Sequence, residues 1–481
     1  MWLTALWVAA ACAPAGDERL ELVPCADQGP QAELQCGRLP VPENPSLPDG
    51  RWIDLRVVVA PALEPMEGAA ALFVLEGGPG IPASHMAEFL VTAGNPYGQS
   101  RDVVMVDLRG TGGSHPLYCP ELEGRGVPPA DHLEEMYPLH KVEACREQLE
   151  ARADLTQYTT ARAVEDLEAV RRALGYERID LQGISYGSRL ALEYIRRHPS
   201  RVRSLLAIGS LPPSHRMPLY HASSFQRAFD LLLKDCEGDA ECHEAYPRLR
   251  EQWLELLERL ERSPARHLYT SGGDSPVVEL EIRRNVFVEK LRSTFYFASA
   301  ARALPRVIVA AAEGDFGPFV ELALPEHPDA PPFLSEGAYL SITCTEDLPR
   351  IGADEVASHT RGTYLGDYRV ARQRHACEAW AKGDVPEDFD QPVASSVPAL
   401  LVTGERDPVT PPSEAEKVAA ALENARVVIV PHAGHLPWDA SNVGCVDRIL
   451  LDFLERASAD GLDLGCLQEL EPAPFGLPGA S

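Results

Sequence analysis

The sequence predicts an α/β fold, with a mostly parallel, doubly wound sheet and a mainly helical segment inserted into it. Apolar runs typical of buried strands alternate with amphipathic helical stretches in the first and last parts of the chain. Between them lies a long stretch of helical patterns without comparable alternation. A Gly-x-Ser-x-Gly pentapeptide, Gly183 to Gly187, stands between a predicted strand and a predicted helix.

Length and composition place the chain among folded globular proteins. Its 481 residues are 45% hydrophobic and 24% charged, and this length allows about two to four domains, or one large domain with an insertion. Asp and Glu outnumber Lys and Arg by 72 to 44, which gives a formal net charge of −28. Such a surface would repel phosphates, so we expect no nucleic acid partner.

The first part of the chain alternates strands with helices, and two of its strands run into glycine-rich loops. Thr159 or Thr160 is suited to cap one helix, and Gly175 to end it. The alternation predicts parallel strands with helices on both faces of the sheet. The expected elements are the strands 53–60, 71–75 and 102–106, a helix ending at 174, the strand 179–181, a helix to about 198 and the strand 202–208.

The remainder of the chain predicts an inserted cap and then a return to the sheet. Helical patterns at 250–260 and 287–313 belong to the cap, and alternation resumes with strands at 399–402 and 427–430. The predicted divisions are a leader (1–16), the first part of the core (17–211), the helical cap (212–391), the second part of the core (392–470) and a tail (471–481).

Ser185 lies at the centre of the pentapeptide and is the candidate nucleophile. Glycines on both sides let the neighbouring backbone pass closely, and the following helix favours negative charge at its N-terminus. A serine hydroxyl is a weak nucleophile near neutral pH, so it needs a base and a carboxylate that orients the base.

Both groups are available after the last two predicted strands. Asp407 follows one strand and His435 follows the next, in the chain order Ser, Asp, His. Glu405 and His432 are the alternatives. We prefer Asp407 and His435 because each lies deeper in its loop.

An acyl-transfer site also needs two backbone amides for the oxyanion. The amide of Tyr186, which follows the nucleophile, is one candidate. The second is Gly78, in the Gly77-Gly78-Pro79-Gly80 loop that follows a central strand. Proline has no amide hydrogen, and glycine permits close approach. Asp107 and Arg109, in the next loop, are expected to brace it rather than to react.

Several motifs together resemble the α/β-hydrolase family of proline iminopeptidases and tripeptidyl aminopeptidases. They are GGPG (77–80), DLRGTGGS (107–114), GISYGS (183–188), GERDPVTPP (404–412) and GHLPWD (434–439). Cys344 to Asp347 and Cys377 to Trp380 are similar to the tripeptidyl aminopeptidase branch, which has a larger, disulfide-bearing cap.

This resemblance implies an α/β-hydrolase fold, the triad Ser185, Asp407 and His435, and release of single residues or short peptides from a free N-terminus. Proline iminopeptidases generally show His-Gly-Gly-Pro-Gly, whereas this chain has Glu76 in the first place. The departure argues against strict specificity for N-terminal proline.

An aminopeptidase must bind an ammonium group, for which carboxylates are the natural partners. Glu346 and Asp347 are the candidates. The alternative function is an esterase or other small-acyl serine hydrolase, which uses the same triad without such acids. Peptides are therefore the expected partners, and we expect a monomer. No metal or nucleotide motif is present, so no metal and no cofactor are expected.

Eleven cysteines without a CxxC pair indicate an oxidising compartment. Without Cys12, ten remain, an even number that sequential pairing closes as five bridges with short loops. The expected pairs are Cys25–Cys36, Cys119–Cys145, Cys236–Cys242, Cys344–Cys377 and Cys445–Cys466.

The first residues of the chain predict an export signal. Met1 to Ala11 is an apolar run too short to span a bilayer. Ala9 to Cys12 resembles a bacterial lipobox, which would tether the protein to a membrane through a lipidated Cys12. Cleavage after Ala13 is the alternative. The expected location is the bacterial periplasm, the cell envelope or the exterior.

Overall fold

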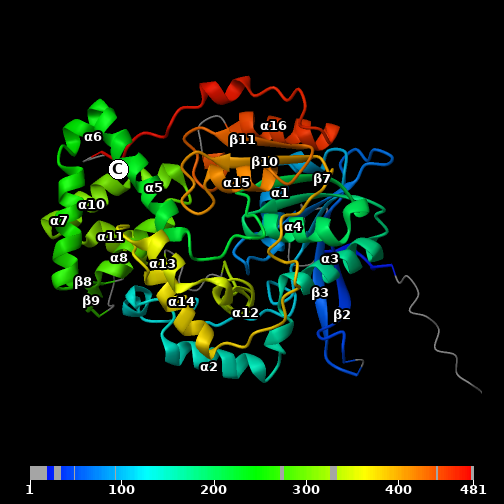
Figure 1. Cartoon of the computed structure of the whole chain (residues 1–481), viewed down its shortest axis with the longest axis horizontal. Helices are drawn as coiled ribbons and strands as arrows, with labels where there is room; N and C mark the ends of the chain where they lie inside the picture. The colour runs from blue at the N-terminus through cyan, green and yellow to red at the C-terminus, as the bar shows by residue number, and fades with distance from the viewer. Residues whose placement is uncertain are drawn as a thin grey trace, which may run out of the picture.

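A nine-stranded sheet forms the centre of the protein, with helices on both faces and a large helical segment beside it (Figure 1). The computed structural model describes residues 19–25, 34–47, 49–92, 94–270, 276–325, 333–439 and 443–477. The predicted leader, including Cys12, lies outside the described residues. Among the helices described, none is long and apolar enough to cross a bilayer.

The sheet has the strand order β1-β2-β3-β5-β4-β6-β7-β10-β11. Its first strands pair antiparallel through β5, and the strands from β5 to β11 are parallel. The strands are Val23–Pro24 (β1), Gln35–Pro42 (β2), Trp52–Ala60 (β3), Ala71–Leu75 (β4), Val103–Val106 (β5), Ile179–Ile184 (β6), Val202–Ile208 (β7), Ala399–Gly404 (β10) and Ala425–Val430 (β11). The predicted mostly parallel, doubly wound sheet is confirmed. Strands β1 and β2 were not predicted, and β3, the predicted strand at 53–60, pairs antiparallel with both β2 and β5.

Alternation along the strands gives the sheet two apolar faces. In β4, Phe73 belongs to the core cluster under α3 and α4, whereas Leu72 and Val74 belong to the cluster under α1 and α16. Thr159 caps α3 by accepting a hydrogen bond from the amide of Arg162. The core helices are Met86–Thr92 (α1), Thr160–Leu174 (α3), Tyr186–Arg197 (α4), Pro412–Ala419 (α15) and Val443–Arg456 (α16).

The described part of residues 212–391 is mainly helical. Phe229, Trp253 and Phe287 pack in an aromatic cluster at the centre of this segment. Its helices are His221–Gly238 (α5), Ala240–Ala245 (α6), Leu249–Arg262 (α7), Arg284–Thr294 (α8), Ala298–Ala301 (α9), Leu304–Glu313 (α10), Gly317–Ala323 (α11), Glu336–Glu346 (α12), Ala353–Thr360 (α13) and Tyr368–Ala379 (α14).

Two local features of this segment differ from the sequence prediction. The helical pattern at 287–313 is divided among α8, α9 and α10, and Pro305 lies in the first turn of α10. A hairpin of Ala265–Tyr269 (β8) and Val278–Ile282 (β9) stands between α7 and α8.

Part of the chain before residue 212 also packs with the cap helices. Helix α2 (Leu139–Glu150) contributes Val142 and Leu149 to a buried cluster with Leu340 of α12 and Val370 of α14. The helical layer is therefore assembled from two separate stretches of the chain.

All five predicted disulfides are present in the structure. Two of them, Cys119–Cys145 and Cys344–Cys377, lie in the cluster that joins α2 to α12 and α14. Disulfides form and persist in oxidising compartments, so the bridges indicate an exported protein.

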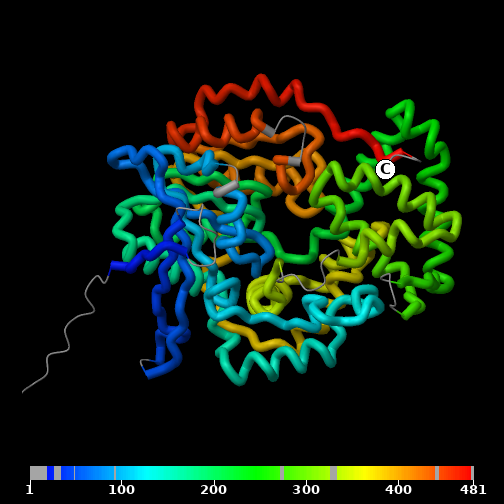
Figure 2. The backbone as a smooth tube through the Cα atoms, turned by 180° about the vertical axis from the view of Figure 1, so that it is seen from behind, coloured from blue at the N-terminus to red at the C-terminus, as the bar shows by residue number. Residues whose placement is uncertain are grey.

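The described end of the chain crosses from the sheet to the helical segment, as Figure 2 shows in red. Phe475 is buried in the aromatic cluster of the cap, with its ring under the guanidinium of Arg302 at 3.8 Å. The hydroxyl of Tyr246 donates to the carbonyl of Gly476 at 2.7 Å. Residues 471–477 therefore connect the core to the cap.

Candidate active site

Ser185 occupies the sharp turn between β6 and α4. Its backbone has φ 55° and ψ −120°, a conformation that is strained for a residue with a side chain and is typical of functional turns. The Ser185 amide donates to the carbonyl of Ile208 at 2.8 Å, which fixes the turn to β7. A Cβ at Gly187 would lie 2.0 Å from the carbonyl oxygen of Leu75, so only glycine fits there.

Asp407 and His435 meet at the ends of β10 and β11. Oδ2 of Asp407 lies 2.7 Å from Nδ1 of His435, and both side chains are buried. A carboxylate only accepts, so Nδ1 carries the hydrogen and Nε2 is left as the basic nitrogen. The amide of His435 donates to the carbonyl of Tyr296 at 2.9 Å, and the two rings meet edge to face at 5.1 Å.

The surroundings of Asp407 favour its ionised form. Burial raises the pKa of this carboxyl, but the charge and hydrogen bond of His435, with hydrogen bonds from Thr410 and the Val409 amide, outweigh burial and hold the pKa below its usual value. The carboxylate can therefore orient the histidine and stabilise its protonated form.

The sequence alternatives, Glu405 and His432, pair with each other instead. Oε2 of Glu405 accepts from the His432 amide at 3.1 Å, and Nδ1 of His432 lies 3.5 Å from Nη2 of Arg406. The structure thus brings together Asp407 and His435, the preferred residues.

The loop after β4 packs directly against the nucleophile turn. A Cβ at Gly77 would lie 3.1 Å from Cβ of Ser185, and Gly78 has φ +103°, which disfavours any other residue. Tyr186, the other predicted oxyanion residue, is the first residue of α4. From the cap, the Ser335 amide donates to the carbonyl of Gly80 at 2.9 Å, so the cap contacts this loop.

Thr410 is a site residue that the sequence prediction missed. Its hydroxyl donates to Oδ2 of Asp407 at 2.7 Å and lies 3.1 Å from Nδ1 of His435. The signal was present in the sequence, because Thr410 follows Asp407 by three residues in the same loop. The prediction treated this loop only as the source of a carboxylate.

Glu346 is buried and has partners in the core. Its carboxylate oxygens accept from the amide and hydroxyl of Thr160, both at 2.6 Å, and that hydroxyl lies 2.7 Å from the hydroxyl of Tyr186. Burial raises the pKa of Glu346 to about 7, although the Thr160 hydrogen bonds lower it.

Asp347 is fully buried and forms an ion pair with Arg189 of α4 at 3.0 Å. Together these two acids join the end of α12 to the core, and this gives them a bracing role in place of the expected contact with a substrate amine. Asp107 and Arg109 brace their loop as predicted: Asp107 accepts from Ser84 and Gly113, and Arg109 forms two 2.7 Å hydrogen bonds with Asp166.

A cavity of about 300 Å³ lies at the start of α12, where Glu336 lines it. Glu336 follows Ser335, the residue that contacts Gly80. Oε2 of Glu123 and Oε2 of Glu289 are buried without a hydrogen-bond partner among the described residues. The charged residues that line the cavity are Glu121, Glu123, Asp131, Glu134, Glu135, Glu289, Glu336, Lys141 and Lys290, so acids predominate.

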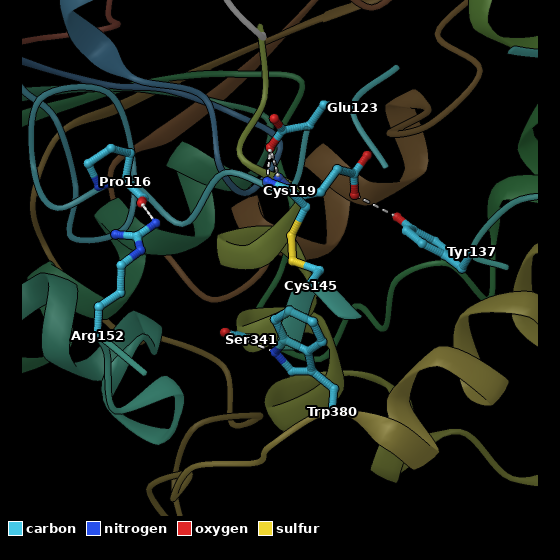
Figure 3. Close-up of a disulfide and its surroundings, with 9 residues drawn as sticks. Pro116, Cys119, Glu123, Tyr137, Cys145, Arg152, Ser341 and Trp380 are labelled. Carbon is cyan, nitrogen blue, oxygen red and sulfur yellow. Dashed lines mark hydrogen bonds between the residues drawn. A yellow bond between two sulfur atoms is a disulfide. The ribbon is translucent and has the colours of Figure 1, made fainter. Parts of the chain in front are cut away.

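The Cys119–Cys145 disulfide lies beside residues that line this cavity. Figure 3 shows Glu123 and Tyr137 beside it. Oε1 of Glu123 accepts from the amides of Cys119 and Glu336 at 2.9 and 3.2 Å. The Tyr137 hydroxyl donates to Glu336 at 3.0 Å. Among the described residues, no cluster of His, Cys, Asp and Glu is arranged to hold a metal ion.

Two family models match this chain. The model described as "alpha/beta hydrolase fold" matches residues 70–244, and the model described as "TAP-like protein" matches residues 363–466. The first contains Ser185 and the GGPG loop, and the second contains Asp407 and His435.

The relatives that this chain resembles along its sequence are named as peptidases. The chain is 25% identical to a tripeptidyl aminopeptidase of Streptomyces coelicolor, over 93% of this chain and 86% of the relative. It is 29% identical to the serine protease Hip1 of Mycobacterium tuberculosis, over 46% of each chain. It is 23% identical to a proline iminopeptidase of Neisseria gonorrhoeae, over 81% of this chain and 90% of the relative.

The strand order, the strained serine turn, the Asp407–His435 contact and the two model matches agree with one another. The chain therefore has the α/β-hydrolase fold, and it is similar to tripeptidyl aminopeptidases over most of its length and to proline iminopeptidases.

Proposed function

We propose that the protein is a serine exopeptidase that cleaves short peptides from a free N-terminus through an acyl-enzyme. The observation that carries the proposal is the 2.7 Å contact between Asp407 and His435, in a fold that places Ser185 on a strained turn. The names of the relatives, two of them aminopeptidases and one a serine protease, support it.

In this mechanism His435 takes the proton from Ser185 as the serine oxygen attacks the peptide carbonyl. Asp407 orients the imidazole and stabilises its positive charge. The amides of Gly78 and Tyr186 donate to the oxygen that becomes negative. The C–N bond then breaks, His435 gives its proton to the departing amine, and water, activated by the same histidine, hydrolyses the ester.

The acid-lined cavity supports an aminopeptidase over an esterase. A peptide with a free N-terminus carries a positive charge that a simple ester lacks, and Glu123, Glu289 and Glu336 in the lining of the cavity offer carboxylates to it. We assign the ammonium group to this cavity, in place of Glu346 and Asp347.

A fluorophosphonate probe tests the nucleophile. One adduct on Ser185 is expected by intact-mass analysis, and Ser185→Ala should lose the adduct together with several orders of magnitude in kcat/KM. Full peptidase activity in Ser185→Ala would overturn the assignment.

A substrate panel separates aminopeptidase from esterase. Free and N-acetylated tripeptide amides are compared with short-chain esters, and acetylation should abolish most of the peptidase activity. Glu289→Gln and Glu336→Gln should raise KM for the free peptide. Glu251→Gln is the matched control, because Glu251 belongs to an exposed ion pair on α7, and it should leave KM unchanged. Indifference to acetylation with fast ester cleavage favours the esterase.

The proposed location is the bacterial periplasm, the cell envelope or the exterior, with the protein as a monomer. Mass spectrometry of the mature N-terminus distinguishes a diacylglyceryl Cys12, which would tether the enzyme to a membrane, from a chain cleaved after Ala13. Light scattering on the purified protein tests the monomer.

A further inference from the structure

Glu76 is a buried carboxyl next to the nucleophile that the reaction above does not use. It stands between the end of β4 and Gly77, the glycine that packs against Ser185. Its exposed fraction is 6%. Oε2 accepts a long hydrogen bond of 3.4 Å from the Gly77 amide, and Oε1 is without a hydrogen-bond partner among the described residues.

Titratable groups on the elements around Glu76 are engaged elsewhere. Asp107, after β5, accepts from Ser84 and Gly113, and His85, at the start of α1, contacts the carbonyl of Pro82. His435, after β11, contacts Asp407, and the hydroxyl of Tyr186 on α4 contacts Thr160. No described cation therefore compensates a charge on Glu76.

We propose that Glu76 is a positioning residue of the oxyanion loop, whose neutral carboxyl permits negative charge on the reacting oxygen and whose carboxylate opposes it. The inference rests on the proposed function. Gly77 stands between Glu76 and Gly78, the proposed oxyanion donor, and packs against Ser185, so a carboxylate on Glu76 is two residues along the chain from the group that binds the developing negative charge. Two negative charges this close in a buried site repel each other.

The ionisation of Glu76 falls in the range where the enzyme would operate. Burial raises its pKa to about 7, although the Gly77 amide lowers it. The oxyanion effect therefore predicts that acylation declines as pH rises through this pKa.

The experiment measures acylation by p-nitrophenyl acetate from pH 5 to 9 in the wild type, Glu76→Gln and Glu76→Asp. The neutral isostere should remove the alkaline decline and raise the acylation rate at pH 8.5 by about tenfold, whereas Glu76→Asp should keep a decline. Reaction with this ester needs Ser185 and the oxyanion amides but no ammonium group, so it does not depend on aminopeptidase specificity.

Three results would overturn the inference: a wild-type profile that stays flat above pH 7, an unchanged alkaline decline in Glu76→Gln, or an equal loss at every pH in that variant. If Glu76→Gln does not fold, the inference is tested on the wild type and Glu76→Asp. The acylation rate of both must decline as pH rises above 7. Absence of any acylation in the wild type would instead refute the proposed serine hydrolase.

Discussion

Nη1 of Arg189 lies 3.0 Å from Oδ1 of Asp347, and both side chains are almost completely buried. Arg189 belongs to the first turn of α4, directly after the nucleophile, and Asp347 follows the last residue of α12 in the cap. The pair therefore joins the cap to the helix that positions Ser185. A buried charge without its partner is costly, so this contact should be important for stability.

Asp347→Ala should lower the free energy of unfolding by about 3–5 kcal/mol, because it leaves the Arg189 guanidinium buried and unpaired. Urea denaturation, followed by fluorescence, measures this loss of unfolding free energy. The exposed pair Arg248–Glu251 on α7 provides the control, since Glu251→Ala should change stability by less than about 1 kcal/mol. Equal effects in the two variants would contradict the bracing role.

Thr410→Val should reduce kcat/KM about tenfold while leaving the fold intact. The substitution removes a hydrogen bond to Asp407 and a polar contact with Nδ1 of His435, so the histidine is oriented less well. Thr410→Ser keeps the hydroxyl and should restore most of the activity. The measurement is kcat/KM of the three proteins on one peptide amide. If Thr410→Ser is as impaired as Thr410→Val, the hydroxyl hydrogen bond does not support catalysis.

Glu346 should make stability fall as pH rises. Its pKa is about 4.5 in the unfolded chain and about 7 in the fold, so the native state favours the protonated form. The contribution is complete below pH 4.5 and is lost as pH rises through 7, by about 1–3 kcal/mol. Glu346→Gln should flatten this slope in part, because Glu76 and Glu336 also have a pKa of about 7. Thermal unfolding at several pH values tests it.

Replacing Cys119 and Cys145 with serine should lower the free energy of unfolding by about 2–4 kcal/mol, because the unfolded chain gains freedom. It should also raise KM for peptides with a free N-terminus, since Glu123 is held by the Cys119 amide. The Cys236–Cys242 pair, in α5 and α6, is the control and should leave KM unchanged. Equal KM changes in the two variants would show that the Cys119–Cys145 disulfide has no specific effect on peptide binding in the cavity.

The part of the site that could be predicted from the sequence is the part that local chain geometry determines. A strand, a tight Gly-x-Ser-x-Gly turn and a helix place Ser185, and the residue order along parallel strands places Asp407 and His435 at the same edge. The helix cap at Thr159 and the five disulfides followed from short-range patterns as well.

Features that depend on long-range packing could not be predicted. Glu346 and Asp347 are charged residues in the cap segment, and only the fold shows that Thr160 and Arg189, more than 150 residues earlier, take up their carboxylates. The cavity is another example, because Glu123 and Glu336 are 213 residues apart and meet through one hydrogen bond. Pro305 marked a break within 287–313 that the apolar periodicity concealed.

The contact of Phe475 with Arg302 has a consequence for the order in which the molecule is assembled. Phe475 belongs to the aromatic cluster of the cap, whose other members come from residues 133–368. That cluster cannot be completed until residue 475 has been synthesised and has crossed back over the core. The cap therefore receives its last core residue only after the whole catalytic sequence, from Ser185 to His435, has been synthesised.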